Sequence, residues 1–243
     1  MPDFMASTNS IYHNYFTNRG VDSSTYQSYK IPTYLQQILP LNKEASILDI
    51  GCGFGQMLFA LKKQGYTSLN GLELLPEAAA YCKEQLNLSV EQGRDIELYA
   101  SRHHDRFDLI IMSHVLEHLT KESIIDVLKS ISQMLRTDGV LVLMVPNGQS
   151  PNHSYWMWED FTHHTLFTAG SLLYVLKSAG FSKIEFLDPN DLLDKPPLKR
   201  LFKQFFQYLY RLNQRFWNSV NSSGYHYASP VIYTWELKIK ATK

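Results

Sequence analysis

The sequence predicts an α/β domain whose mostly parallel sheet is doubly wound, with helices covering both faces. Short apolar segments alternate with helical patterns over residues 46–187, as expected for successive βαβ units. Residues 107–112 and 140–145 are apolar runs that suit central strands buried on both faces. A glycine-rich turn joins the first strand to the first helix, at the place where such sheets bind ligands. The 243 residues suffice for one domain of this kind.

Each strand is predicted from a short apolar or alternating run that is bounded by turn residues. The runs occur at residues 46–50, 69–74, 88–91, 107–112, 140–145, 183–187 and 231–240. The run 88–91 is the weakest of them, and the run 231–240 alternates between apolar and polar residues.

Each helix is predicted from apolar residues at spacings of three and four and from residues typical of helix ends. The segments are 31–39, 56–64, 76–86, 121–135 and 168–179. Pro32 and Pro76 stand in first turns, where a missing N–H group is tolerated. Thr168 is a typical N-cap, and Gly180 ends the helix that Thr168 begins.

The pattern also predicts how the chain is divided. Residues 1–45 are expected to form an N-terminal cap segment, and residues 46–243 the α/β domain. Residues 147–167 form a loop insertion rich in histidine and aromatic residues, and loops of this length are usually functional or disordered. Residues 190–228 form a second insertion, which is helical, before the last strand.

Composition narrows the classes of function. Lys plus Arg equals Asp plus Glu at 23 each, which gives no support for a nucleic-acid partner. Cys52 and Cys82 are too few for a disulfide framework, so a cytoplasmic protein is expected. No signal peptide is expected, since the N-terminus lacks a basic segment followed by an apolar run. No apolar stretch of about 18 residues predicts a membrane-spanning helix.

The turn Asp49-Ile50-Gly51-Cys52-Gly53-Phe54-Gly55 carries the main chemical signal. Glycine permits a tight turn and lets a ligand approach the backbone, and the helix that follows offers free N–H donors. The spacing Gly-x-Gly-x-Gly differs from the dinucleotide pattern, and no Gly-Lys-Ser/Thr phosphate loop is present. Glu73 lies 24 residues after Asp49 and ends the second strand. A carboxylate at that place can accept hydrogen bonds from ribose hydroxyls.

This segment resembles motif I of the class I S-adenosylmethionine-dependent methyltransferases, and Glu73 resembles their ribose-binding acid. Residues 107–110 and 113–119 resemble the fourth-strand signature of the small-molecule branch. The resemblance spans about residues 45–187. It implies a Rossmann-like sheet of seven strands, mostly parallel, with the last strand antiparallel. It also implies S-adenosyl-L-methionine as the cofactor and S-adenosyl-L-homocysteine as the product.

The same resemblance implies a set of cofactor-binding residues. Asp49 and the three glycines would hold the amino-acid end of S-adenosylmethionine, and Asp95 and Ile96 would flank its adenine. His118 either lies near the ligands or helps to cap a helix, and both interpretations stay open. The full set is Asp49, Gly51, Gly53, Gly55, Glu73, Leu74, Asp95, Ile96, Ser113 and His118.

Residues 160–168 resemble an Asp-x-Thr-His…Phe-Thr segment of methyltransferases connected with sugar and surface-polysaccharide biosynthesis. The resemblance makes His163 and Asp160 catalytic candidates, and the adjacent His164 has no fixed counterpart. A neutral imidazole can accept the proton that a hydroxyl loses during methylation. Asp160 could then orient the ring and stabilise the imidazolium. Alternatively, both side chains only hold the loop in place through hydrogen bonds to the backbone.

No metal is predicted from the pattern. The loop residues His153, Asp160, His163 and His164 are of types that bind metal ions. However, no close paired spacing such as His-Glu-x-x-His is present. The expected cofactor is therefore S-adenosylmethionine alone.

Residues 196–217 predict an amphipathic helix. One face carries Leu198, Leu201, Phe202, Phe205, Leu209, Leu212 and Phe216. The other face is basic and polar, and residues 195–217 contain no acid. Such a helix can lie on an anionic membrane at the inner face and present the site to a lipid-linked substrate. Most amphipathic helices face their own core, so docking on the domain, over the cleft or in a homodimer is favoured.

The sequence therefore predicts a methyltransferase that O-methylates a sugar hydroxyl of a cell-surface glycan or its precursor. One alternative is O- or N-methylation of a small aromatic such as a quinone precursor. Another is a non-catalytic partner subunit that binds S-adenosylmethionine. Nucleic-acid methylation is disfavoured, since no Asn-Pro-Pro-Tyr-like motif follows the fourth strand.

Overall fold

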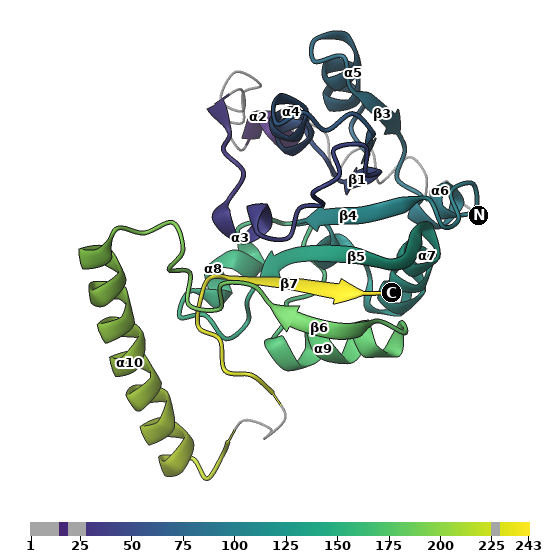
Figure 1. The fold of residues 1–243 in the computed structure, drawn as a ribbon. Coiled ribbons are helices and arrows are strands. Elements are labelled where there is room, and N and C mark those ends of the chain that lie inside the picture. The colour runs from purple at the N-terminus through teal and green to yellow at the C-terminus, as the bar shows by residue number, and fades with distance from the viewer. Residues whose placement is uncertain (1–14, 19–27, 225–228) are drawn as a thin grey trace.

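The computed structural model describes residues 15–18, 28–224 and 229–243 (Figure 1). Its strands are β1 (Ile47–Ile50), β2 (Leu69–Glu73), β3 (Ser89–Gln92), β4 (Phe107–Ser113), β5 (Leu135–Pro146), β6 (Ser182–Phe186) and β7 (Glu236–Thr242). They form one seven-stranded sheet in the order β3-β2-β1-β4-β5-β7-β6. Strand β7 is antiparallel to both β5 and β6, and the pairs among β1 to β5 are parallel. The predicted fold class, with an antiparallel last strand, is confirmed.

The helices connect the strands and cover the sheet (Figure 1). They are α2 (Tyr15–Asn18), α3 (Thr33–Gln36), α4 (Gln56–Lys63), α5 (Pro76–Glu84), α6 (Ile96–Ala100), α7 (Lys121–Met134), α8 (His153–Trp158), α9 (Ala169–Ser178) and α10 (Pro197–Val220). A 3-10 turn spans Leu116–His118. Thr168 caps α9 as expected, because its side chain accepts a hydrogen bond from the amide of Ser171 while the Thr168 amide donates one to the Ser171 hydroxyl.

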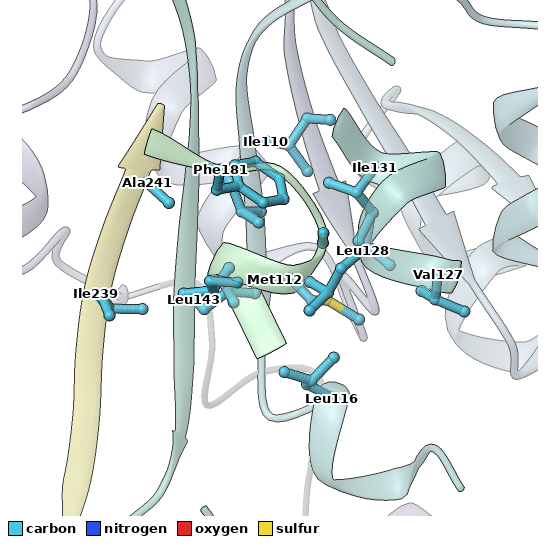
Figure 2. Close-up of a cluster of buried hydrophobic side chains, with 14 of the residues drawn as sticks. Ile110, Met112, Leu116, Val127, Leu128, Ile131, Leu143, Phe181, Ile239 and Ala241 are labelled. Atoms are coloured by element: carbon cyan, nitrogen blue, oxygen red, sulfur yellow. The ribbon is translucent and has the colours of Figure 1, made fainter. Parts of the chain in front are cut away.

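The core lies on both faces of the sheet because successive strand residues point to opposite sides. In β4, Ile110 and Met112 belong to the cluster that includes residues of α7 and α9 (Figure 2). Leu109 and Ile111, which alternate with them, belong to the cluster on the other face with residues of α4 and α5. This two-sided burial explains why the central strands are continuous apolar runs.

Two strands begin five residues away from the predicted start, and the starts of the other strands agree to within one residue. Strand β5 begins at Leu135, directly after α7, rather than at residue 140. Strand β7 begins at Glu236 rather than at residue 231. The carbonyls of Ile232 and Thr234 instead accept hydrogen bonds from the buried side-chain amide of Asn147. The side chain of Asn147 therefore bonds carbonyl groups that the alternating pattern predicted to bond a neighbouring strand.

Helix α10 is present as predicted, and it is not buried against the domain. None of its residues is buried, and Figure 1 shows it to one side of the sheet. The partly covered side chains are polar or amphipathic ones, namely Lys203, Gln207, Tyr210, Arg211, Gln214 and Asn218. The large apolar side chains of α10 are exposed, although Phe202 lines a hollow with Pro151 and Tyr233. The apolar face is therefore not buried in the core of its own domain, contrary to one part of the favoured expectation, and the homodimer stays a prediction. Within the ranges that the structure describes, no helix is long and apolar enough to cross a membrane.

The proposed division of the chain lies partly outside the described residues. The cap segment 1–45 is described at residues 15–18 and 28–45, and the insertion 190–228 is described as far as residue 224. The loop insertion 147–167 contains one short helix, α8, which the sequence did not predict. The domain boundaries themselves stay a prediction.

Candidate active site

A cavity of about 370 Å³ lies at the carboxyl ends of β1, β2 and β4. The strand order reverses direction between β1 and β4, which is where doubly wound sheets bind ligands. A cavity of this size falls within the range of small-molecule sites. Its lining consists of Tyr15, Phe16, Tyr29, Asp49, Gly51, Cys52, Gly53, Gln56, Met57, Glu73, Leu74, Leu75, Ile111, Ser113, His114, Val115 and His118.

The three glycines of the turn have positive φ angles of 73°, 54° and 78°, but they serve different purposes. A Cβ on Gly51 would lie 2.3 Å from Val115, and one on Gly55 would lie 2.8 Å from the Cys82 sulfur. These two positions are therefore small because of packing inside the protein. A Cβ on Gly53 would meet no atom closer than 3.7 Å. Both Gly51 and Gly53 line the cavity, and Gly53 is the one of the two at which the absence of a side chain leaves open space.

Glu73 is buried at the end of β2, and both of its carboxylate oxygens are fixed by the backbone. Oε2 accepts a hydrogen bond from the Gly53 amide at 2.7 Å, and Oε1 accepts one from the Leu75 amide at 2.8 Å. Burial raises the pKa of Glu73, and these hydrogen bonds act in the opposite direction. A carboxylate has about four acceptor positions, so capacity remains for two ligand hydroxyls.

Asp49 is the second acid of the cavity and is buried in β1. Burial, with a smaller contribution from Glu73, raises the pKa of Asp49 to about 8. The folded protein therefore disfavours the ionised carboxylate at neutral pH. A positively charged ligand group beside Asp49 would offset this cost, so the site is suited to a cationic ligand end.

Aromatic residues from the N-terminal segment complete the cavity wall. Tyr15, Phe16 and Tyr29 line it, and the rings of Phe16 and Phe54 are 4.6 Å apart. These residues were not predicted from the sequence, because the first 30 residues show no periodic pattern. Their aromatic enrichment was the available signal.

Some predicted site residues lie away from the cavity. Asp95 is exposed, and its side chain accepts a hydrogen bond from Leu98 as the N-cap of α6. Ile96 is buried in the hydrophobic core. Neither they nor Gly55 line the cavity, whereas the other predicted cofactor-binding residues do.

A cluster of two histidines and two carboxylates adjoins the cavity; we call it the acid–histidine cluster, and it comprises Glu117, His118, Asp160 and His163. The two imidazole rings lie 4.7 Å apart, edge to face. Asp160 Oδ2 is 3.6 Å from His163 Nε2 and 3.9 Å from His118 Nε2. Glu117 Oε1 is 3.9 Å from His163 Nε2. Thus the predicted pair Asp160–His163 is brought together, and it joins a pair from the end of β4.

Hydrogen bonds fix the tautomers of both rings. His163 Nδ1 is 2.8 Å from the carbonyl oxygen of Trp156, which can only accept. Thr162 Oγ1 donates to Asp160 Oδ1 at 2.6 Å, so it accepts from His118 Nδ1 at 2.8 Å. Burial lowers the pKa of His118, which favours the neutral ring. Each neutral ring therefore carries its proton on Nδ1 and a lone pair on Nε2.

Two residues connect the acid–histidine cluster with the cavity. His118 lines the cavity, and so does Tyr15, whose hydroxyl donates to Asp160 Oδ2 at 3.1 Å. His164 does not join the cluster: its side chain is exposed, and its backbone amide donates to the carbonyl of Glu117. That hydrogen bond holds the loop 147–167 against the end of β4.

His114 supports the cluster from the other side and was not identified from the sequence. Its Nδ1 is 3.1 Å from Glu117 Oε1, and its Nε2 is 2.8 Å from Glu236 Oε1. Burial disfavours the charged ring, but the two carboxylates outweigh burial and raise the pKa of His114 to about 10. Glu236 comes from β7, so only the folded sheet assembles this arrangement.

The sequence matches known methyltransferases. A family model described as a methyltransferase domain matches residues 24–185. The chain is 31% identical over 153 residues to a trans-aconitate 2-methyltransferase of Deinococcus radiodurans, covering 61% of this chain and 52% of that protein. It is 26% identical over 162 residues to a ubiquinone biosynthesis O-methyltransferase of Coxiella burnetii, covering 65% and 64%. The alignments thus span between about half and two thirds of these curated relatives.

Solved structures share the fold. An S-adenosylmethionine-dependent methyltransferase from Archaeoglobus fulgidus superposes with a TM-score of 0.65 at 18% identity, covering 96% of this chain and 99% of that one. A possible histamine N-methyltransferase from Thermotoga maritima superposes with a TM-score of 0.58 at 16% identity, covering 96% and 98%. The sheet is therefore the Rossmann-like fold that the sequence resemblance implied.

Proposed function

This chain belongs to the methyltransferase-domain family, and we propose that it is an S-adenosylmethionine-dependent methyltransferase that methylates an oxygen atom of its acceptor substrate. The observation that carries the proposal is the buried carboxylate of Glu73, fixed by the Gly53 amide at the wall of the cavity. The acid–histidine cluster stands at the His118 side of the same cavity.

The residues present fit S-adenosylmethionine, which supplies a methyl group activated by a sulfonium. Glu73 would accept hydrogen bonds from the ribose hydroxyls, and Asp49 would face the positively charged amino-acid end. Gly53 leaves space for the ligand, since its backbone carries no side chain on the cavity wall. Phe16 and Tyr29 add apolar surface that excludes water from the ligand.

The acid–histidine cluster is proposed to activate the acceptor oxygen. A hydroxyl must lose its proton as the new carbon–oxygen bond forms, and a positioned Nε2 lone pair serves this purpose. His163 and Asp160, the pair expected from the sequence, lie beside each other with the lone pair of His163 toward the carboxylate. The exposed His164 is not included in this proposal.

The acceptor is proposed to be a sugar hydroxyl of a cell-surface glycan or its precursor. Support comes from residues 160–168, whose Asp-x-Thr-His spacing resembles enzymes connected with polysaccharide biosynthesis. In the structure this spacing places Thr162 so that it joins Asp160 to His118. This contact supports the proposal that the segment forms the acceptor side of the site.

A second candidate acceptor is a phenolic hydroxyl. It is favoured by the similarity to ubiquinone biosynthesis O-methyltransferases, which reaches 36% identity over 89 residues in several Coxiella burnetii strains. The aromatic wall of Tyr15, Phe16 and Tyr29 would suit an aromatic ring.

Helix α10 is proposed to bind an anionic membrane surface, where lipid-linked acceptors are found. This contact would place the protein at the inner face of the membrane. The large exposed apolar side chains include Leu198, Phe205 and Phe216. Lys199, Arg200 and Arg215 are exposed as well, and residues 195–217 contain no acid to oppose them. A helix with one apolar face and one basic face is typical of helices that lie in the headgroup region.

Transfer of a radioactive methyl group tests the function. The purified protein is incubated with methyl-tritiated S-adenosylmethionine and either nucleotide sugars, polyprenyl-linked glycans or polyprenyl phenols. Label in a carbohydrate acceptor supports the glycan proposal, and label in a phenol supports the second candidate. Binding of S-adenosylmethionine without transfer to either class, or to fractionated extract, would indicate a non-catalytic subunit and contradict the proposal.

A further inference from the structure

We propose that the acid–histidine cluster binds one divalent transition-metal ion. The ligands would be one carboxylate oxygen each from Glu117 and Asp160, and Nε2 of His118 and His163. The role of this site, holding the acceptor oxygen, rests on the proposed function.

The spacing of the donor atoms suits a single ion. One ligand atom each from Glu117, His118 and His163 lies within 4.8 Å of the others. Asp160 Oδ2 is 3.6 Å from His163 Nε2 and 3.9 Å from His118 Nε2. Ligands bound at about 2.1 Å in a tetrahedral zinc site are about 3.4 Å apart, so small side-chain rotations would complete the site.

The hydrogen bonds around the two histidines follow the pattern of metal ligands. A histidine that binds a metal through one nitrogen usually donates its other N–H to a carbonyl or carboxylate group. His163 Nδ1 bonds the Trp156 carbonyl oxygen, and His118 Nδ1 bonds Thr162, which in turn bonds Asp160. Both Nε2 lone pairs are thereby directed to the same region before any ion binds.

The burial of Glu117 is an independent indication. Its carboxylate is completely buried, and His114 contacts Oε1. Oε2 makes no hydrogen bond to any atom of the chain in the ranges described. A buried carboxylate oxygen without a partner is costly, and a bound cation would satisfy it.

The donor types decide which ions fit. Two imidazole nitrogens with two carboxylate oxygens suit zinc, manganese, iron or cobalt, whereas magnesium and calcium prefer ligands that are all oxygen. The sequence predicted no metal because the Glu117–His118 pair and the Asp160–His163 pair are about 40 residues apart. Only the packing of the loop 147–167 against the end of β4 brings them together.

A bound ion would change the chemistry of the cluster. It would occupy the Nε2 lone pair of His163, so that this ring becomes a ligand and no longer takes the acceptor proton itself. A hydroxyl bound to a divalent ion is more acidic than a free one, which serves the same purpose. Removal of the ion therefore distinguishes the two modes of activation.

The test uses cobalt(II) as the probe, because its visible absorption reports nitrogen and oxygen ligands directly. The full chain is stripped with a chelator, and cobalt(II) is titrated by absorption and by calorimetry. We expect one saturable site. Glu117→Gln and His163→Ala should each weaken binding at least tenfold, and His104→Ala, which alters an exposed histidine elsewhere, should not.

Two outcomes would overturn the proposal: the absence of a saturable cobalt site in the parent protein, or equal affinity in the parent and both cluster variants. Glu117→Gln preserves the side-chain volume, so it provides the answer if His163→Ala does not fold. Binding of S-adenosylmethionine is measured on the same preparations. If S-adenosylmethionine still binds but no cobalt site is found, only the metal-site proposal is rejected. If cobalt binds but S-adenosylmethionine does not, only the proposed function is rejected.

Discussion

The backbone amide of Gly53 donates a hydrogen bond to Glu73 Oε2 at 2.7 Å, joining the turn after β1 to the end of β2. Two residues separated by 20 positions in the chain thus form one wall of the cavity. The glycine provides an approach to the backbone, and the acid provides hydrogen-bond acceptors.

Glu73→Gln should weaken S-adenosylmethionine binding at least tenfold, or about 1.4 kcal/mol. The glutamine NH₂ group must face the amide of either Gly53 or Leu75, both of which donate to the carboxylate in the parent protein. That mismatch lowers folding stability, whereas cofactor binding is weakened because an NH₂ group cannot accept a hydrogen bond from a ribose hydroxyl, and a buried donor that loses its acceptor costs about 1–3 kcal/mol. Calorimetry measures the affinity, and the exposed Glu77→Gln is the control. Equal affinities for the parent and Glu73→Gln would exclude Glu73 from the site.

Gly53→Ala should reduce cofactor affinity strongly while the protein still folds. The new Cβ would stand on the cavity wall without a close contact inside the protein. The positive φ adds a cost of about 1–2 kcal/mol. Gly65→Ala is the matched control, since Gly65 also has a positive φ and an open environment but lies after α4. If both variants bind the cofactor equally well, the Gly53 backbone does not meet the ligand.

The stability of the protein should depend on pH through Asp49. The pKa of Asp49 is about 8 in the folded state and about 3.9 in an unfolded chain. The folded state therefore retains a proton that the unfolded state loses, and the free energy of unfolding falls as pH rises between these values. The Asp49→Asn variant lacks this dependence. The amount by which its melting temperature exceeds that of the parent protein should therefore grow from pH 6 to 8 and then level off. Parallel melting curves for both proteins over this interval would contradict the raised pKa.

His163→Ala should lower turnover by roughly 10²–10⁴ and leave the affinity for S-adenosylmethionine nearly unchanged. The expectation is the same whether Nε2 takes the proton or holds an ion, because both uses need this lone pair. His164→Ala should have a much smaller effect, since that side chain is exposed and outside the cluster. Single-turnover kinetics with an identified acceptor provide the measurement. Near-normal turnover of His163→Ala would remove His163 from the reaction.

Helix α10 should bind vesicles that contain anionic lipid and release them at high salt. Sedimentation with neutral and anionic vesicles measures this, because salt screens exposed charges. Phe205→Asp should abolish binding, since it places a charge in the middle of the apolar face. Leu41→Asp is the control, because Leu41 is 97% exposed and lies outside the helix.

A different result would identify another partner for the same face. If the parent protein does not bind vesicles but elutes as a dimer that Phe205→Asp dissociates, the face is an interface between two copies. That outcome would contradict the proposed membrane contact. This result would support the homodimer, which is one of the arrangements that the sequence favours.

The features that sequence predicted well are local ones. The order of strands and helices, the glycine turn and the N-cap at Thr168 each depend on residues that are close in the chain. Glu73 could be placed because its distance from the turn follows from one βαβ unit. By contrast, Asp95 was expected beside the ligand, and in the structure it caps α6, a helix too short to show a clear period.

The features that sequence did not predict depend on distant segments. His114 is held between Glu117 and Glu236, and the last of these lies 122 residues away. The acid–histidine cluster likewise needs the loop 147–167 to fold back on the end of β4. Periodicity predicted α10, but a period cannot show whether the domain, a lipid or another chain covers the apolar face.

The short helix α2 has a consequence for how the two proposed ligands, cofactor and acceptor, would influence each other. Tyr15 hydrogen-bonds Asp160 on the acceptor side, while the adjacent Phe16 packs on Phe54 in the glycine turn. One four-residue segment thus contacts both halves of the site. A ligand that shifts this segment alters the free energy of binding for the other, and thermodynamic reciprocity requires the influence to be equal in both directions.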